Sequence, residues 1–245
     1  MALLNSRSLI NKFDLLQSLV FSKSLYVICI TETWLNNQIL DNEIIPQNYK
    51  IYRRDRESRG GGVLIAISED INAKLVHTHT TVELIHIELD IKPIAHIICV
   101  YVPPSCSDSY HREVTRYLNS VSLTTDTFII GDFNVPDVNW HTLNASQPFS
   151  LMLCDFACSK NFIQLITSCT HRQGNTLDLI FTNSPHRVNN INISQPSILT
   201  DHYLVSADIH IAIACRSHST NQDVFHYSYL RADFESMGNF SGSRC

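Results

Sequence analysis

The chain has 245 residues, of which 44% are hydrophobic and 17% are charged, so it can bury one large core. No apolar run approaches the roughly 18 residues of a membrane-spanning helix, and the N-terminus has no signal-peptide pattern, which predicts a soluble intracellular protein. The net charge of −5 argues against binding polyanions through lysine and arginine alone. It does not exclude an enzyme that meets phosphate through a metal ion, because the ligands of such an ion are acidic.

Short runs rich in valine and isoleucine alternate with amphipathic segments along the chain. The runs that predict buried strands are Tyr26–Ile30, Val63–Ile67, Ile97–Val102 and Phe128–Ile130. Apolar residues at three- and four-residue spacing predict helices over Lys12–Phe21, Ser109–Ser122 and Phe149–Asn161. The charged stretch Arg53–Gly62 ends in three glycines and predicts a loop that enters the strand at Val63. This alternation predicts an α/β or α+β fold in which helices cover sheets.

The eight cysteines lie mostly inside these apolar strand or helix patterns. None belongs to a CxxC pair, and their spacing does not suggest a disulfide framework. We therefore expect buried free thiols rather than disulfides.

The most informative string is Ile129–Asn134, in which an apolar strand runs into Gly131 and then presents Asp132 and Asn134. Strand alternation would place these two side chains on the same side. A carboxylate that orients water, beside an amide that donates to a phosphate oxygen, is what phosphodiester hydrolysis requires. Because glycine, aspartate and asparagine also dominate turns, a simple turn is an equal alternative for this string alone.

Four other strand-like segments place polar residues in the same way: Glu32 after Tyr26–Ile30, Tyr101 in Ile97–Pro104, Asp178 in Leu177–Phe181, and Asp201 with His202 before Leu204. Each polar residue also has an ordinary explanation. Glu32 suits a helix start, Asp178 the solvent face of a strand, and His202 a core with its hydrogen bonds satisfied. Tyr101 suits an interfacial aromatic position. An aspartate–histidine pair directly before a strand nevertheless suits a metal or phosphate site better than a random loop.

In chain order, one set of polar residues resembles the motif series of the endonuclease/exonuclease/phosphatase superfamily: Asn5, Glu32, Tyr101, Asp132, Asn134, Asp178, Asp201 and His202. The flanking strings are similar to the endonuclease domain of LINE-type (non-LTR) retrotransposons: Leu4–Leu9, Thr31–Leu35, Arg59–Val63, Thr176–Asn183 and Thr200–His202. The resemblance covers Leu3 to Ile211. It implies a deoxyribonuclease-like, four-layer sandwich of two packed mixed β-sheets flanked by helices.

The resemblance also implies a metal-dependent endonuclease that hydrolyses a DNA phosphodiester bond and leaves 3′-hydroxyl and 5′-phosphate ends. Glu32 would hold the metal, with Asn5 and Asp201 nearby as further ligands or supporting groups. Mg²⁺ suits this oxygen-rich set, and Mn²⁺ is an alternative. A free 3′-hydroxyl is what primes reverse transcription in such elements.

The catalytic roles carried over by the resemblance fall on five residues. Asp132 would orient or deprotonate the attacking water, and Asn134 and Tyr101 would hold phosphate oxygens. His202 would stabilise the developing charge. Asp178 would fix the imidazole ring of His202 in one tautomer.

The polar segment Thr170–Thr176 contains a glycine–asparagine pair, which predicts the tip of a hairpin. In the retrotransposon nucleases a hairpin at this place projects beside the active site and helps to choose the cleavage position. Arg172 and Gln173 are therefore candidate DNA-binding residues, and His171 is expected to reach a minor groove with Arg172. A passive turn with hydrated side chains is an equal alternative.

Five other arginines, Arg7, Arg53, Arg54, Arg56 and Arg59, are interpreted as a solvated face and left out of the site. The two tryptophans, Trp34 and Trp140, are interpreted as core or loop anchors.

Residues 1–211 are expected to form the nuclease domain, with a truncated first strand because only four residues precede Asn5. Residues 212–245 are expected to form a linker-like tail, and Tyr229–Phe234 resembles the segment that leads to a reverse transcriptase, which is absent here. We expect a monomer that binds DNA and no membrane, and that acts in the nucleus on chromosomal DNA. Two alternatives are an inactive retrotransposon-derived relic and a phosphodiesterase for RNA or a small phosphorylated molecule.

Overall fold

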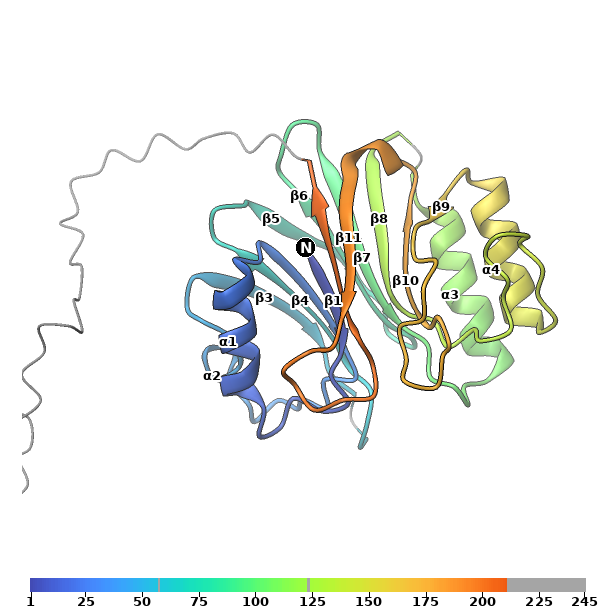
Figure 1. Cartoon of the computed structure of the whole chain (residues 1–245). Helices are drawn as coiled ribbons and strands as arrows, with labels where there is room; N and C mark the ends of the chain where they lie inside the picture. Colours follow the sequence, from blue (N-terminus) through green and yellow to red (C-terminus); the bar gives the residue numbers. More distant parts are fainter. Residues whose placement is uncertain (57, 123, 211–245) are drawn as a thin grey trace, which may run out of the picture. The chain divides into compact units, whose positions relative to one another are not determined.

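Two β-sheets pack face to face with helices on both outer faces in the computed structural model, which describes residues 1–56, 58–122 and 124–210 (Figure 1). This four-layer arrangement confirms the predicted deoxyribonuclease-like sandwich. The tail predicted for residues 212–245 lies outside the described residues. None of the helices in the described ranges has the length and apolar content needed to cross a lipid bilayer.

The first sheet has six strands in the order β11-β12-β1-β2-β4-β3. Their bounds are β1 Ala2–Asn5, β2 Val27–Thr31, β3 Tyr49–Arg54, β4 Val63–Ser68, β11 Val188–Ser194 and β12 Leu204–Ile209. Strand β1 has four residues, yet it lies centrally, parallel to β2 and antiparallel to β12. Because parallel neighbours end at the same edge, Asn5 is paired with Thr31, and the residues after both strands leave the sheet together.

The second sheet also has six strands, in the order β5-β6-β7-β8-β10-β9. Their bounds are β5 Ala73–Thr78, β6 Glu83–Leu89, β7 Ala95–Tyr101, β8 Asp126–Asp132, β9 Ile163–Gln164 and β10 Asp178–Thr182. Strand β8 runs parallel to β7 and antiparallel to β10. In this register Asp132 is the partner of both Tyr101 and Asp178, so three predicted site residues form one row at the end of the sheet.

Helices α1 (Phe13–Lys23) and α2 (Asp41–Ile44) cover the first sheet, and α3 (Asp108–Ser120) and α4 (Pro148–Ser159) cover the second (Figure 1). A short 3₁₀ helix, η1 (Pro185–Arg187), precedes β11. Helix α3 begins after Ser107, whose Oγ accepts a hydrogen bond from the Tyr110 backbone N–H at 3.3 Å, as an N-cap does.

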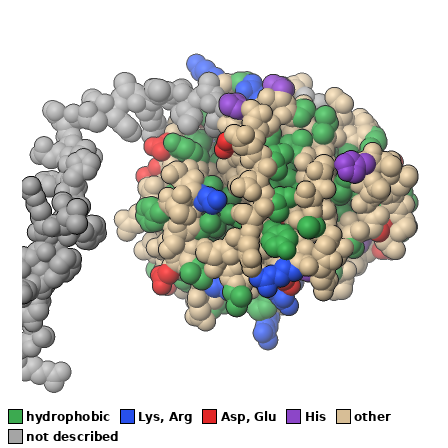
Figure 2. Space-filling model, viewed as in Figure 1, with side chains coloured by type: hydrophobic (Ala, Val, Ile, Leu, Met, Phe, Trp, Pro, Cys, Tyr) green, Lys and Arg blue, Asp and Glu red, His purple; other side chains and the backbone are tan. Residues whose placement is uncertain are grey.

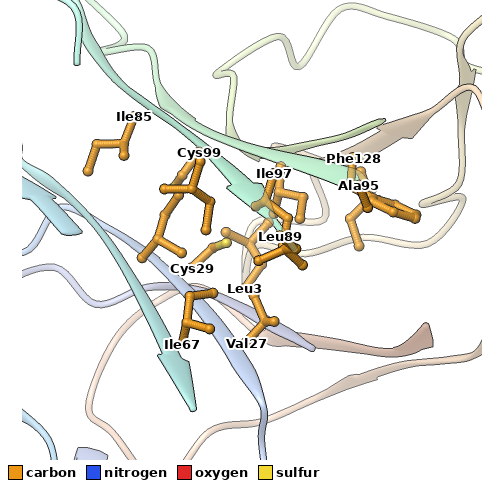
Figure 3. Packing of buried hydrophobic residues seen from close by; sticks show 14 of the residues in the cluster. Leu3, Val27, Cys29, Ile67, Ile85, Leu89, Ala95, Ile97, Cys99 and Phe128 are labelled. Carbon is orange, nitrogen blue, oxygen red and sulfur yellow. The ribbon is translucent and has the colours of Figure 1, made fainter. Parts of the chain in front are cut away.

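The largest core lies between the two sheets. Figure 3 shows Leu3, Val27 and Cys29 of the first sheet meeting Ile97 and Cys99 of the second. Each sheet also packs a second apolar face against its own helices. Strands buried on both faces need apolar residues at every position, which explains why the predicted runs are continuous rather than alternating.

Two expectations from the sequence need correction here, one on a strand boundary and one on the cysteines. Arg53 and Arg54, expected in a loop, are the last residues of β3, and the loop begins only after them. The cysteine thiols, expected to be buried, differ in their exposure to solvent. Cys29, Cys99 and Cys154 are buried as expected, whereas Cys158 and Cys169 are exposed, because they lie on the solvent side of α4 and in the connection between β9 and β10.

Histidines gather where β5, β6 and β7 meet α3. His86 Nε2 lies 2.9 Å from His96 Nδ1, and His86 Nδ1 lies 2.8 Å from the Tyr117 hydroxyl. The ring of His77 stacks on Tyr117 with centroids 4.9 Å apart. Burial lowers the pKa of His86 to about 4, and the neighbouring His96 and His77 contribute further.

This histidine cluster should make the fold sensitive to acid. The unfolded chain takes up a proton at His86 near pH 6.5 and the folded chain only near pH 4, so the free energy of unfolding falls as the pH is lowered through this window. For His86 alone we expect a loss of about 2 kcal/mol between about pH 7 and about pH 5. Urea unfolding at both pH values measures it. His86→Gln should lose less free energy of unfolding over this pH range than the wild type, whereas the control His141→Gln should lose as much as the wild type. Equal pH dependence of His86→Gln and wild type would contradict the prediction.

Candidate active site

A groove with a volume of 880 Å³ lies at the end of the sandwich where β1, β2, β7 and β8 finish. Its lining includes most of the predicted site residues: Glu32, Tyr101, Asp132, Asn134, Gln173, Asp201 and His202. Asn5 and Asp178 are fully buried and contact these lining residues from behind. Arg172 is exposed and does not line the groove.

Asn5 joins the two sheets at this end. Its side-chain nitrogen donates to Glu32 Oε1 at 3.1 Å and to Asp132 Oδ2 at 2.8 Å, so one amide connects a residue that follows β2 with the last residue of β8. The oxygen of the same amide accepts from the Arg7 backbone N–H at 3.0 Å. Asn5 therefore presents its donor, and not its oxygen, to the two carboxylates.

Glu32 follows β2 with a left-handed backbone (φ 51°), and two further donors hold its carboxylate in the groove. The Tyr101 hydroxyl donates to Oε1 at 3.0 Å, and Trp34 Nε1 donates to Oε2 at 3.4 Å. Burial, together with the charge of Glu32, raises the pKa of Tyr101 above its usual range. Tyr101 consequently stays neutral and remains a hydrogen-bond donor.

His202 lies between two buried carboxylates. Its Nδ1 is 2.7 Å from Asp178 Oδ2, and its Nε2 is 4.0 Å from Asp132 Oδ2. Burial lowers the pKa of His202, but the hydrogen bond to Asp178 and the charges of Asp178 and Asp132 outweigh burial and raise it to about 9. Burial and the charge of Asp178 also raise the pKa of Asp132. The set is thus built around an imidazole that carries a proton at neutral pH.

Asn134 reaches the groove in a different way from the one predicted. Strand β8 ends at Asp132, and Asn134 has a left-handed backbone (φ 49°), so strand alternation does not set its direction. Its backbone N–H donates to Asp132 Oδ1 at 3.1 Å, and its side-chain nitrogen donates to the Val102 carbonyl at 2.8 Å. The turn alternative therefore describes the backbone here, and this turn still places Asn134 in the groove.

Asp201 is fixed by side chains from two distant segments. Its Oδ2 is 2.6 Å from Arg7 Nη1 and 3.4 Å from His171 Nε2, while Oδ1 is buried without a hydrogen-bond partner. Arg7 is 60% exposed, as the solvated-face interpretation expects, but it also lines the groove and contacts Asp201. The interpretation is wrong for Arg56, which is half-buried and pairs with the buried Glu83 far away in sequence.

The segment 170–176 forms a tight turn whose two ends are hydrogen-bonded, because the Thr170 N–H donates to the Asn175 carbonyl at 2.9 Å. Gly174 has a positive φ of 85°, and its N–H donates to the His171 carbonyl at 2.9 Å. The backbone of this turn pairs with the segment before β12: the Arg172 N–H donates to the Asp201 carbonyl, and the Tyr203 N–H to the Thr170 carbonyl. The expectation that His171 reaches a DNA groove is wrong, because its ring is buried 4.7 Å from the ring of His202.

The donor set fits a hard divalent cation. Carboxylate oxygens of Glu32, Asp132 and Asp201 all face the groove, and the buried Oδ1 atoms of Asp178 and Asp201 have no hydrogen-bond partner within the described ranges. Oxygen-rich sets of this kind suit Mg²⁺. Two compact groups of metal-ligating side chains occur in the part of the chain that the structure describes, His171–Asp201–His202 and Asp132–Asp178–His202, and Glu32 belongs to neither.

Comparisons with known proteins agree with this geometry. Residues 95–206 match a family model described as endonuclease-reverse transcriptase, and no curated protein sequence matches the chain. The endonuclease domain of TRAS1, a telomere-specific non-LTR retrotransposon, has a TM-score of 0.67 at 12% identity, over 86% of this chain and 97% of that one. An AP endonuclease from Archaeoglobus fulgidus has a TM-score of 0.64 at 18% identity, over 85% and 98%. The 3′ phosphatase NExo from Neisseria, bound to a product DNA hairpin, has a TM-score of 0.65 at 12% identity, over 85% and 98%.

These findings confirm the resemblance that the motifs indicated. The chain has the two-sheet fold of the endonuclease/exonuclease/phosphatase superfamily, and the endonuclease domain of a non-LTR retrotransposon is among its structural neighbours. Residues 95–206 match the endonuclease-reverse transcriptase model, and the neighbours that share the fold are described as endonucleases and a 3′ phosphatase.

Proposed function

We propose that the chain is a divalent-metal-dependent endonuclease that hydrolyses one DNA phosphodiester bond and leaves 3′-hydroxyl and 5′-phosphate ends. The proposal rests on one observation: Glu32, Asn5 and Asp132 are joined by hydrogen bonds in the groove, and the Asp178–His202 pair adjoins Asp132. This set offers a carboxylate for water, a protonated imidazole for phosphate and neutral donors beside them. Hydrolysis of a phosphodiester requires these three kinds of group.

In this proposal Asp132 orients the attacking water and accepts its proton, while the amide of Asn5 keeps the carboxylate directed into the groove. His202 donates through Nε2 to a phosphate oxygen as negative charge develops, because Asp178 engages Nδ1. Tyr101 donates its single hydroxyl proton to Glu32 Oε1 and so would hold this carboxylate in place for the cation. The water oxygen forms a bond to phosphorus as the bond from phosphorus to the 3′ oxygen breaks, and the leaving 3′ oxygen takes up a proton from solvent, so the products are a 3′-hydroxyl and a 5′-phosphate.

Glu32 and Asp201 are the residues that would hold the cation. A bound Mg²⁺ or Mn²⁺ would neutralise charge on the phosphate, and this is the chemistry that the protein side chains alone do not supply. Asn5 would support Glu32 from behind, because its own oxygen already accepts from Arg7.

DNA is the proposed substrate because one structural neighbour is a retrotransposon endonuclease and another is bound to DNA. Basic side chains also gather at the groove end of the molecule, between the gold loop (165–177) and the orange loop (195–203) of Figure 1, as Figure 2 shows. Such side chains position the phosphate backbone. An enzyme that nicks chromosomal DNA would act in the nucleus.

Nicking of supercoiled plasmid with Mg²⁺ tests the proposal, with chelator in place of metal as the control. We expect open-circular product only with the metal. A polymerase should extend this product and a ligase should reseal it, because both reactions need a 3′-hydroxyl and the second needs a 5′-phosphate. Cleavage of RNA instead of DNA would assign the groove to another substrate. A folded chain that binds metal but cleaves neither would support an inactive relic.

Gln173 lines this groove and its neighbour Arg172 is exposed, and we predict that the two residues choose the cleavage position. In the double variant Arg172→Ala/Gln173→Ala, mapped nicks should redistribute, while total nicking should change by less than about threefold because other phosphate contacts remain. Sequencing of nick positions measures this. The control is Arg116→Ala on the outer helix α3, where the arginine pairs with Glu113 of the same helix. If the nick positions do not change, the turn at 170–176 is a passive connector.

A further inference from the structure

We propose that His171, Asp201 and His202 form a second metal site, selective for a borderline transition metal such as Zn²⁺, and that its occupation inhibits the enzyme. One ligand atom from each residue lies within 4.8 Å of the other two. His171 Nε2 is 3.4 Å from Asp201 Oδ2, and the two imidazole rings meet edge to face with centroids 4.7 Å apart. The three side chains come from two segments that the backbone pairing of 170–176 with 201–203 holds together.

Each imidazole already uses its other nitrogen. Nδ1 of His171 accepts from the Gln173 backbone N–H at 3.2 Å, and Nδ1 of His202 is hydrogen-bonded to Asp178 at 2.7 Å. In both rings Nε2 is the nitrogen that faces the shared space, and in both it carries a proton, because Nδ1 of His171 accepts and the imidazole of His202 is protonated. A bound ion would therefore release the Nε2 proton of His202, and the proton of His171 would have to move to Nδ1 at the expense of the hydrogen bond from Gln173. A carboxylate hydrogen-bonded to the distal nitrogen of a metal-binding histidine is a frequent feature of zinc sites, since it fixes the ring and makes it more basic.

The composition of the cluster decides which metal it prefers. Two imidazoles and one carboxylate suit Zn²⁺ or Co²⁺, which bind nitrogen well, whereas Mg²⁺ and Mn²⁺ prefer oxygen ligands. Glu32 and Asp132 provide only oxygen. The groove therefore contains an oxygen-only part suited to a hard cation and, beside it, a part with two imidazoles suited to a transition metal, and Asp201 is common to both.

Arg7 is the group that a transition metal would displace from Asp201. Its side chain is 60% exposed, and exposed ion pairs contribute little stability, so displacement costs little. The second oxygen, Asp201 Oδ1, is buried without a partner and is available to the same ion.

Occupation of the site would inhibit catalysis because it takes Nε2 of His202 away from the phosphate. Mg²⁺ should relieve this inhibition poorly, since it does not replace nitrogen-bound Zn²⁺. The inhibition rests on the proposed function, whereas the binding itself does not.

Titration of the metal-free full-length chain with Co²⁺, followed by visible absorption, and with Zn²⁺, followed by calorimetry, tests the binding. We expect one bound ion and no thiolate charge-transfer band. His171→Gln should weaken binding at least about tenfold. His171→Cys should retain binding and add a thiolate band, which an altered fold would not produce.

Two other histidine sites provide the controls. His111 also lines the groove and lies 3.0 Å from Cys106 Sγ, and His96 belongs to the histidine cluster beside α3. His111→Gln and His96→Gln should bind Co²⁺ and Zn²⁺ as the wild type does. Loss of binding in either control, or wild-type binding by His171→Gln, would overturn the proposal.

Inhibition is measured as the Zn²⁺ concentration that halves nicking in excess Mg²⁺, with each variant normalised to its own rate without Zn²⁺. His171→Gln should need at least about tenfold more Zn²⁺ than the wild type. If wild type and His171→Gln need the same Zn²⁺ concentration for half inhibition, inhibition does not act through this site. If the wild type nicks no DNA at all, the proposed function fails while the binding data still decide whether the metal site exists.

Discussion

His202→Ala and Asp132→Ala should each lower the rate of DNA nicking by at least about a hundredfold, because acid–base and charge-stabilising groups each contribute on that order. His202→Ala removes the only imidazole that Asp178 orients among the described residues. Asp132→Ala removes the carboxylate that Asn5 directs into the groove. Initial rates on supercoiled plasmid at saturating Mg²⁺ measure both effects.

The fold should survive both changes. The buried pair Asp132 and Asp178 repel each other, and part of their charge is balanced by His202, so each variant alters the local charge without touching the apolar core between the sheets. Circular dichroism and urea unfolding check this. His111→Gln, in the same groove but outside the hydrogen-bonded set, should nick like the wild type. Near-normal nicking by a folded His202→Ala or Asp132→Ala chain would remove that residue from the mechanism.

The strand-end residues were predictable because their polarity contrasts with the apolar runs that contain them. Tyr101, Asp132 and Asp178 lie at the ends of strands whose central residues are apolar, and the register then brings them into one row. A buried strand tolerates a polar group only where the structure satisfies it, so the contrast itself indicates a site. The sandwich followed from the same runs, together with the family resemblance.

Arg7 and His171 could not be assigned correctly from sequence. Both side chains contact Asp201, which is distant from them in the sequence. The identity of one residue and its immediate neighbours does not reveal such a partner. Trp34 is a similar case: interpreted as an anchor, it lines the groove and donates to Glu32. A surface arginine or a loop aromatic acquires its role only when the tertiary fold supplies the contact.

Strand β11 was missed for a local reason. Val188–Ser194 contains three asparagines, lies at the edge of its sheet and has a register shift between Asn189 and Asn192. An edge strand with exposed side chains has little need for apolar periodicity, so no periodicity signals it. The backbone hydrogen bonds to β12 stabilise this strand instead.

Gly131→Ala should lower the free energy of unfolding by at least about 3 kcal/mol, a large effect for one methyl group. Gly131 is paired with Val100 of β7 and Leu179 of β10, and a Cβ at this position would lie 1.8 Å from the Val100 carbonyl oxygen. The obstructing atom belongs to the backbone of a central strand, so a rotamer change cannot relieve the clash. Strand β7 would have to move away from β8.

Urea unfolding of Gly131→Ala and Gly174→Ala separates this close approach from backbone conformation. Gly174 has a positive φ of 85° and open space around its Cβ position, so alanine there should cost only about 1–2 kcal/mol. Equal destabilisation by the two variants would show that close approach to β7 does not explain the glycine. Because Gly131 directly precedes Asp132, movement of β7 would also shift Tyr101 relative to Asp132. The nicking rate of Gly131→Ala should therefore fall by more than its folded fraction, as measured by urea unfolding, falls.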